Sequence, residues 1–144
     1  MVYGGGSIKK NGIYDQVTNA LNGFEVTEFS GIEANPHYET CMKAVDVVKE
    51  KNIDFLLAVG GGSVIDATKF IAAAYYYEGE PWDILSKGGV IKKALPLGVV
   101  LTLSATGSEM NERSVISRAE TREKLNFASP LVFPQFAILD PEVT

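Results

Sequence analysis

The sequence has few of the features that mark secreted and membrane proteins. Its 144 residues include one cysteine, Cys41, so no disulfide can form within the chain, and a reducing, cytoplasmic setting is the simplest expectation. The longest apolar run, Ile71 to Tyr77, is far shorter than the roughly 20 residues of a membrane span. Met1-Val2-Tyr3 leads directly into a glycine-rich segment, with no recognisable signal peptide.

Positive charge is also scarce. The formal net charge is −5, and lysine and arginine form no cluster larger than pairs such as Lys9-Lys10 and Lys92-Lys93. Nucleic acid and anionic membranes are therefore not expected as partners. The composition is that of a soluble globular protein, with 46% hydrophobic and 22% charged residues, and the length predicts one domain over residues 1–144.

Short β-like runs alternate with longer helical stretches along the chain. Ser63 is expected to cap the third helix, with Asp66 in a capping-box-like position. A small hairpin is expected from 114–118 and 125–127. The expected strands are the end of a strand at Val2-Tyr3, 24–29 near an edge, 55–59, 97–101 and 136–139. The expected helices are 13–21, a second with Asn35 as cap and Pro36 at its first position, ending near Lys51, and 63–76.

This order of elements predicts an α/β fold, a Rossmann-like dinucleotide-binding domain with a parallel sheet, flanking helices and the small hairpin. Ligands of such sheets bind at the carboxyl ends of the strands. Two glycine loops, Gly4-Gly5-Gly6-Ser7 and Gly60-Gly61-Gly62-Ser63, are expected at those ends.

The glycine loops are suited to holding phosphate groups. Glycine lets a ligand approach the backbone closely, and a following helix offers free N–H groups and a positive dipole end. Neither loop fits the fingerprint G-x-G-x-x-G or the Walker pattern, because the sixth positions are Lys9 and Ile65 and no Gly-Lys-Ser/Thr follows. Tight turns without a ligand remain an alternative for both loops. The hydroxyl-rich segment Thr102 to Glu109 can likewise be a ligand loop or a polar connector.

A family resemblance narrows these alternatives. The run from Leu56 to Lys69 resembles the pyrophosphate-binding core of iron-dependent (group III) alcohol dehydrogenases. The resemblance extends through Asn35-Pro36, Ala105 to Glu109 and Leu139-Asp140-Pro141, and so covers essentially the whole chain. The first loop, Tyr3 to Lys10, is similar to that of the NADPH-dependent butanol dehydrogenase and aldehyde reductase branch.

The resemblance implies a set of cofactor-binding residues. Gly61, Gly62 and Ser63 would bind the pyrophosphate, with Asp66 close to the nicotinamide end; simple helix capping is a compatible role for Asp66. The residues implied to contact the cofactor from the next loop and from the hairpin are Thr102, Leu103, Thr106 and Lys124.

The first loop bears on the choice of nucleotide. The position of Gly5 is often aspartate in NAD-dependent relatives, where it holds the adenine ribose hydroxyls. A carboxylate there would repel a 2′-phosphate, so Gly5, Gly6 and Ser7 favour NADP, with Lys9 or Lys10 supplying neutralising charge.

No catalytic or metal-binding residue is expected in this chain. The resemblance implies a second, all-helical domain that holds a divalent metal, iron or zinc, with one aspartate and three histidines. The single histidine, His37, is expected at the surface. We therefore expect a domain fragment without that second domain, inactive alone. Its first strand is short. The unpaired edge of the sheet could pair with a second copy of the chain, so a homodimer is one expected assembly.

The expected function is that of the NADP(H)-binding domain of a metal-dependent alcohol dehydrogenase or aldehyde reductase, which transfers hydride between NADPH and a small aldehyde or alcohol. One alternative is an NAD-dependent enzyme similar to glycerol dehydrogenase or dehydroquinate synthase. Another is a stand-alone, non-catalytic nucleotide-binding module. A phosphate-binding domain related to sugar kinases is the least favoured.

Overall fold

A computed structural model describes residues 1–102 and 107–139 of the chain. The helices are α1 (Ser7–Lys10), α2 (Ile13–Ala20), α3 (Tyr38–Lys51), α4 (Gly62–Tyr76) and α5 (Asp83–Ser86), with short 3₁₀ turns η1 (Ser108–Met110) and η2 (Pro130–Val132). The strands are β1 (Leu56–Gly60), β2 (Leu97–Leu101), β3 (Arg113–Arg118), β4 (Glu123–Ala128) and β5 (Ala137–Leu139).

The main sheet is parallel. Its order is β1-β2-β5, with Leu56 opposite Leu97 in the first pair and Val99 opposite Ala137 in the second. Val2 extends the sheet beyond β1, because it bridges both Ala58 and Phe29 in parallel. The expected α/β fold with a parallel sheet is confirmed.

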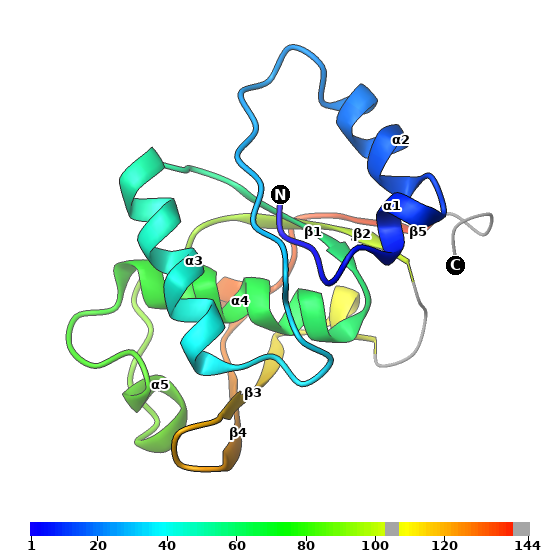
Figure 1. Cartoon of the computed structure of the whole chain (residues 1–144). Coiled ribbons are helices and arrows are strands. Elements are labelled where there is room, and N and C mark those ends of the chain that lie inside the picture. The colour runs from blue at the N-terminus through cyan, green and yellow to red at the C-terminus, as the bar shows by residue number, and fades with distance from the viewer. Residues whose placement is uncertain (103–106, 140–144) are drawn as a thin grey trace.

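Helices cover both faces of this sheet (Figure 1): α3 and α4 lie on one side, and α1 and α2 lie on the other. The strands alternate accordingly. Leu56 and Ala58 pack in the core on the α4 side, whereas Val59 and Val100 pack with Ile13 in a smaller cluster on the α2 side. This alternation is the two-residue period of a strand buried on both faces.

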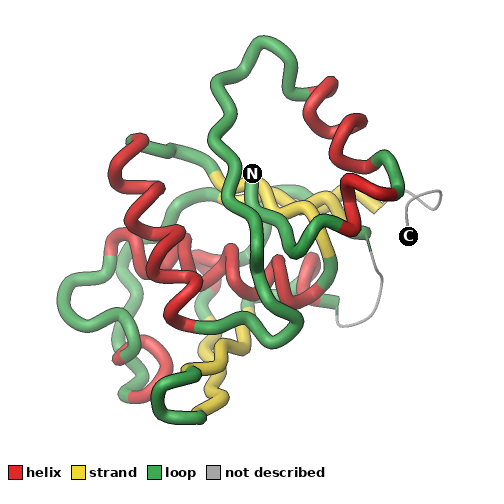
Figure 2. The backbone as a smooth tube through the Cα atoms, in the orientation of Figure 1, coloured by secondary structure: helices red, strands yellow, loops and turns green. Residues whose placement is uncertain are grey.

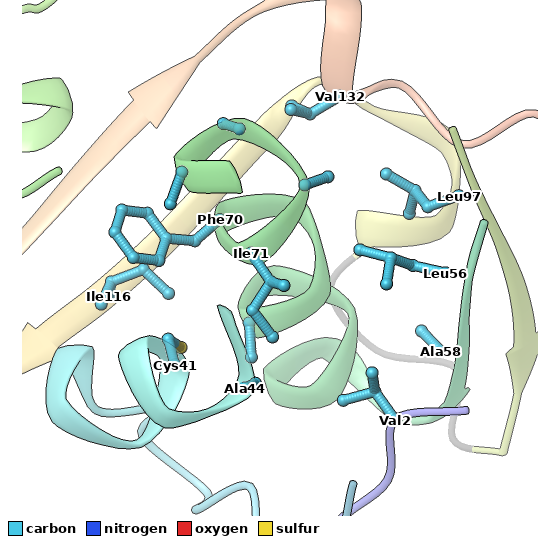
Figure 3. Packing of buried hydrophobic residues seen from close by; sticks show 14 of the residues in the cluster. Val2, Cys41, Ala44, Leu56, Ala58, Phe70, Ile71, Leu97, Ile116 and Val132 are labelled. Atoms are coloured by element: carbon cyan, nitrogen blue, oxygen red, sulfur yellow. The ribbon is translucent and has the colours of Figure 1, made fainter. Parts of the chain in front are cut away.

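Helix α4 is the most deeply buried element. Ten of its residues are buried, from Val64 to Ala74, because the helix lies between the sheet and the hairpin of β3 and β4 as well as beside α3. Figure 3 shows Phe70 of α4 pointing toward Ile116 of β3. A helix that is apolar on all sides needs such complete cover. No helix among the described residues has the length and apolar character to cross a membrane.

The expected hairpin is confirmed and is a separate two-stranded sheet. Strands β3 and β4 pair antiparallel, with Arg113 opposite Ala128 and Arg118 opposite Glu123. Arg122 in the turn has φ +56°, a left-handed conformation that a tight connection demands. The hairpin covers the side of α4 that faces away from the main sheet.

The prediction of a strand over 24–29 is wrong in its extent. Only Phe29 forms a bridge, and Figure 2 shows the whole connection from α2 to α3 as loop apart from such isolated bridges. The Met1 amine donates to the Thr27 carbonyl and the Phe29 N–H to the Met1 carbonyl. Within 24–29, pairing is thus confined to the end of the segment, and Phe24, which is 72% exposed, has no strand beside it.

Helix α3 begins later than the Asn-Pro signal predicts. Its N-cap is His37 rather than Asn35, and the Glu33 carboxylate accepts the His37 N–H at 3.3 Å. The cause is tertiary pairing: Pro36 accepts a hydrogen bond from the Ser117 N–H of β3 at 2.9 Å, and His37 bridges Ser117. These contacts hold the backbone at residues 36–37 in an extended conformation, so the helix begins after them.

Replacing Phe70 by alanine should strongly destabilise the fold. The ring is fully buried and lies edge-on to Tyr38 at 5.8 Å and Phe127 at 6.2 Å between centroids. We expect a loss of about 3–5 kcal/mol in the free energy of unfolding, measured by urea denaturation. Phe24→Ala is the control, with an expected change below about 0.5 kcal/mol. Equal effects of the two variants would contradict this account of the core.

Candidate functional site

The two glycine loops and Thr102, which follows β2, meet at the carboxyl-terminal edge of the parallel sheet. A Cβ at Gly4 would lie 3.8 Å from Cγ2 of Val64 in the first turn of α4, so the first glycine loop borders the second. The Thr102 N–H donates to the Gly60 carbonyl at 3.0 Å, which fixes the start of the third loop beside the second. The arrangement expected from the strand order is therefore present for Gly4, Gly60 and Thr102.

The second glycine loop presents free backbone donors. Gly61 is the N-cap of α4, and its carbonyl accepts the Ile65 N–H at 3.1 Å. Within residues 1–102 and 107–139, the N–H groups of Gly62 and Ser63 have no acceptor. They stand at the N-terminus of a 15-residue helix, where the helix dipole favours a negative group.

Gly60 has a packing role that the sequence reasoning did not assign. A Cβ at this position would lie 2.7 Å from Cγ2 and 2.9 Å from Cβ of Val64, closer than real carbon atoms approach. The missing side chain therefore lets the first turn of α4 sit directly against the end of β1. This close approach aims the N-terminus of the helix at the loop edge.

Ser63 and Asp66 do not form the expected capping box. The Ser63 hydroxyl donates to the Ala34 carbonyl, and α4 has no side-chain cap. The Asp66 carboxylate instead accepts the Val115 N–H at 3.2 Å, and its backbone carbonyl accepts the Ser114 hydroxyl at 2.7 Å. Long-range partners, Ala34 for Ser63 and strand β3 for Asp66, have replaced the local capping bonds.

The Asp66 carboxyl group lies in an unusual electrostatic setting. Burial raises its pKa above the ordinary value, opposed by the Val115 N–H, the Ser108 hydroxyl and the charge of Lys69. A half-buried carboxyl group beside a helix N-terminus and near a loop edge is the kind of group found at functional sites.

The first glycine loop differs from the second in two ways. It leads into α1, which is only four residues long, so it lacks the strong helix N-terminus of the second loop. Gly6 has φ +125°, a conformation open to glycine and strained for other residues. A Cβ at Gly5 would meet nothing within 4 Å, and Gly5 and Ser7 are exposed.

Lys9 is engaged beside the first loop. Its Nζ lies 4.9 Å from the Tyr14 ring centroid and 5.7 Å from that of Tyr3. Both tyrosine hydroxyls donate to the Glu28 carboxylate, at 2.8 Å and 2.6 Å, and the pKa of Glu28 is lowered, chiefly by the Tyr14 hydrogen bond. Of the two lysines expected to neutralise a phosphate, Lys9 thus already has partners.

The remaining expected residues lie in different places. Thr102 is half-buried at the sheet edge, whereas Leu103 and Thr106 lie outside the described residues. Lys124 is exposed on β4, and its Nζ donates to Asn35 Oδ1 at 3.3 Å. Asn35 adjoins Ala34, the acceptor of the Ser63 hydroxyl, so Lys124 is linked to the second glycine loop through 34–35.

Lys69 is a notable residue to which the sequence reasoning gave no role. Its side chain is fully buried, and its Nζ donates to Ser108 O at 2.6 Å, Asn111 Oδ1 at 2.9 Å and Arg113 O at 2.9 Å. The signal that could have found it is a lysine placed between Thr68 and Phe70 in a helix apolar on all sides.

The part of the chain that the structure describes offers no group of three histidine, cysteine, aspartate or glutamate residues that could hold a metal ion. The described residues therefore do not fit a catalytic metal. His37 is partly exposed, with Nδ1 3.2 Å from a Glu33 carboxylate oxygen.

The parallel sheet, the glycine loop leading into α4 and the hairpin beside it define an α/β domain of the class in which ligands bind at the carboxyl edge of the strands. The family model for iron-containing alcohol dehydrogenases matches residues 1–141. The chain therefore belongs to this family, and the resemblance drawn from the sequence is confirmed.

Named relatives agree with this assignment. The chain is 61% identical to a probable NADH-dependent butanol dehydrogenase 1 of Bacillus subtilis, over 98% of this chain and 37% of the relative. It is 58% identical to the NADPH-dependent aldehyde reductase YqhD of Escherichia coli, over 100% of this chain and 38% of the relative. The chain thus spans well under half the length of these relatives.

Solved structures show the same fold. The crystal structure of YqhD from Escherichia coli matches with a TM-score of 0.95 and 59% identity, over 97% of this chain and 37% of that one. The crystal structure of NADH-dependent butanol dehydrogenase A from Thermotoga maritima matches with a TM-score of 0.95 and 47% identity, over 99% of this chain and 36% of that one.

Replacing Gly60 by alanine should destabilise the domain by forcing α4 away from β1. Because the added methyl group would meet Val64 well inside contact distance, we expect a loss of about 1–3 kcal/mol in the free energy of unfolding, measured by urea denaturation. The matched control is Gly5→Ala, where the methyl group has open space. A Gly60→Ala variant as stable as Gly5→Ala would show that the close approach is not required.

Proposed function

We propose that this chain binds NADP(H) at the three loops, as the nucleotide-binding part of an oxidoreductase that transfers hydride between NADPH and small aldehydes or alcohols. The observation that carries the proposal is the pair of N–H groups of Gly62 and Ser63, which have no acceptor among the described residues and lie at the N-terminus of the long helix α4. Such donors, together with the helix dipole, match the charge of a pyrophosphate.

The proposed pose runs along the sheet edge. Gly61, Gly62 and Ser63 hold the pyrophosphate, and Asp66, one turn further along α4, lies toward the nicotinamide. Thr102 contacts the cofactor from the neighbouring strand end, together with Leu103 and Thr106 of the same loop. Lys124 reaches the nucleotide from the hairpin; its link to the second loop through Asn35 supports this role.

The adenosine end is proposed to lie at the first loop. Gly5 and Gly6 leave room for a 2′-phosphate, because a Cβ at either position would meet nothing within 4 Å, and neither they nor Ser7 carry a carboxylate. Lys10 is the better of the two lysines for neutralising that phosphate, because Lys9 already contacts two tyrosine rings near Glu28. The names of the relatives include both NADH and NADPH, so the preference for NADP rests on this loop.

The reaction is proposed from the relatives, which are named butanol dehydrogenases and an aldehyde reductase. When bound, the nicotinamide supplies the hydride chemistry. The residues of this chain bind and orient the cofactor, and the described ones supply no metal site. We propose a small aldehyde or alcohol as substrate and a homodimer as assembly.

A stand-alone nucleotide-binding module without catalysis is the second candidate. The observation in its favour is that the described residues offer no cluster of metal-binding side chains. Both candidates share the nucleotide site. They differ in whether the complete coding sequence that contains this chain yields a protein that consumes NADPH when butanal and ferrous ion are added.

The purified chain should bind NADPH saturably and more tightly than NADH. We expect a preference of about tenfold, equivalent to about 1.4 kcal/mol of binding free energy, because the first loop carries no carboxylate. The measurement is a titration that follows nicotinamide fluorescence, with ATP as competitor. Absence of binding by a chain that circular dichroism shows to be folded would refute the site, and tighter binding of ATP than of NADPH would favour a different ligand.

Introducing a carboxylate at Gly5 should reverse the nucleotide preference. A side chain fits there without contact, so Gly5→Asp should keep the fold while it repels the 2′-phosphate and offers acceptors to ribose hydroxyls. We expect NADPH affinity to fall by about tenfold or more relative to NADH affinity. Gly5→Asn is the matched neutral control. If both variants bind NADPH as the wild type does, the adenosine end does not lie at this loop.

A further inference from the structure

Lys69 is a fully buried amine in the interior of α4. Lysine is almost never buried completely unless its charge is paired or hydrogen-bonded, because removing an ammonium group from water costs free energy. Here all three acceptors of the Nζ come from one segment, Ser108 to Arg113. The amine therefore links α4 by three hydrogen bonds to the segment that leads into β3.

These hydrogen bonds of Lys69 lie beside the proposed nucleotide site. Ser108 begins η1, and Arg113 begins β3. Two residues into β3, the Val115 N–H donates to the Asp66 carboxylate, and the intervening Ser114 hydroxyl donates to the Asp66 carbonyl. Asp66 and Lys69 are three residues apart in α4, so they bind neighbouring parts of the same segment.

We propose that Lys69 is a positioning residue of the nucleotide site, whose ammonium group holds the segment Ser108 to Arg113 against α4 and thereby fixes the backbone that orients Asp66. The inference rests on the proposed function, in which Asp66 lies toward the nicotinamide. Lys69 itself touches no ligand and acts through the segment that it binds.

The geometry requires the charged form of the amine. An ammonium group has three N–H donors and meets three acceptors, whereas a neutral amine has two donors and would turn a lone pair toward one acceptor. The charged groups that face it are Asp66 from α4 and Glu109 from η1; Arg113 contributes its carbonyl oxygen. Burial lowers the pKa of Lys69 to about 8, against the opposing effect of these two carboxylates.

The first test is Lys69→Met, which keeps the length of the side chain and removes the donors. We expect NADPH affinity to fall by about tenfold or more and hydrogen exchange to rise in 107–115, while circular dichroism remains that of the wild type. Lys92→Met, at an exposed position, is the matched control and should change neither. A folded Lys69→Met variant with unchanged NADPH affinity overturns the proposal.

A second variant keeps the proposal testable if Lys69→Met does not fold. Asn111→Ala removes one of the three acceptors and leaves the charge in place, so it should weaken NADPH binding less than Lys69→Met and in the same direction. Faster exchange in 107–115 without any loss of affinity would overturn the positioning role. If the wild-type chain binds neither NADPH nor NADH, both the proposed function and the positioning role fail. If the wild-type chain binds NADPH and neither variant changes the affinity, only the positioning role of Lys69 is overturned.

The pH profile distinguishes positioning from simple core packing. Well below pH 8 the amine is protonated and NADPH binding should be at full strength; affinity should fall as the pH rises through about 8. Because the folded pKa lies below the unfolded one, the unfolded chain binds more protons in this range, so this group does not lower global stability as pH rises.

Lys69→Arg supplies the final control for the pH profile, because arginine keeps its charge throughout this range. It should retain measurable binding and lose the decrease in affinity near pH 8. The Met1 amine, whose pKa is lowered chiefly by burial, is present in every variant. A decrease that persists unchanged in both Lys69→Arg and Lys69→Met therefore belongs to another group and overturns the role of Lys69.

Discussion

The close contact between Gly60 and Val64 is the constraint on which the rest of the structure depends. It sets the first turn of α4 against the end of β1, which aims the helix N-terminus at the sheet edge and fixes the depth of the whole helix. With α4 at that depth, the sheet buries one side of it and the hairpin must cover another. The N–H groups of Gly62 and Ser63, which have no acceptor among the described residues, lie at this helix N-terminus, where the N-cap Gly61 has no side chain to cap them.

The hairpin is held to α4 by polar contacts as well as apolar ones. Phe70 and Phe127 pack edge-on in the core, but the placement of β3 along the helix comes from Asp66 and Lys69, whose hydrogen bonds have fixed partners and directions. Apolar packing alone tolerates small shifts along a helix, whereas a buried ammonium group with three acceptors does not. Two ionisable residues in the most apolar helix therefore set where the hairpin meets the candidate site.

The elements that sequence could predict are those whose partners lie within the element or its immediate pattern. The expected strand at 97–101 identified β2 with its observed ends, and the helix expected to end near Lys51 is α3, which ends at that residue. The errors at Asn35 and Ser63 share one cause: a partner distant in sequence displaced the local bond that the pattern predicted. The error at 24–29 has a different cause, because most of this segment has no strand beside it. Pro36 pairs with Ser117, and the Ser63 hydroxyl with Ala34. Lys69 escaped notice because its three acceptors are about 40 residues away.

The two glycine loops, alike in sequence, differ in the length of the helix that each one begins. The second continues into 15 helical residues and gains a strong helix N-terminus, whereas the first continues into four residues and then turns at Gly12. A helix dipole acts mainly through its first turn and needs an uninterrupted helix behind it. In the proposed complex, the second loop therefore supplies the larger electrostatic contribution, which is the same for NADP(H) and NAD(H). The first loop, with an open position at Gly5 and a nearby lysine, is proposed to contribute less attraction and more discrimination, so the proposal divides affinity and nucleotide choice between the two loops.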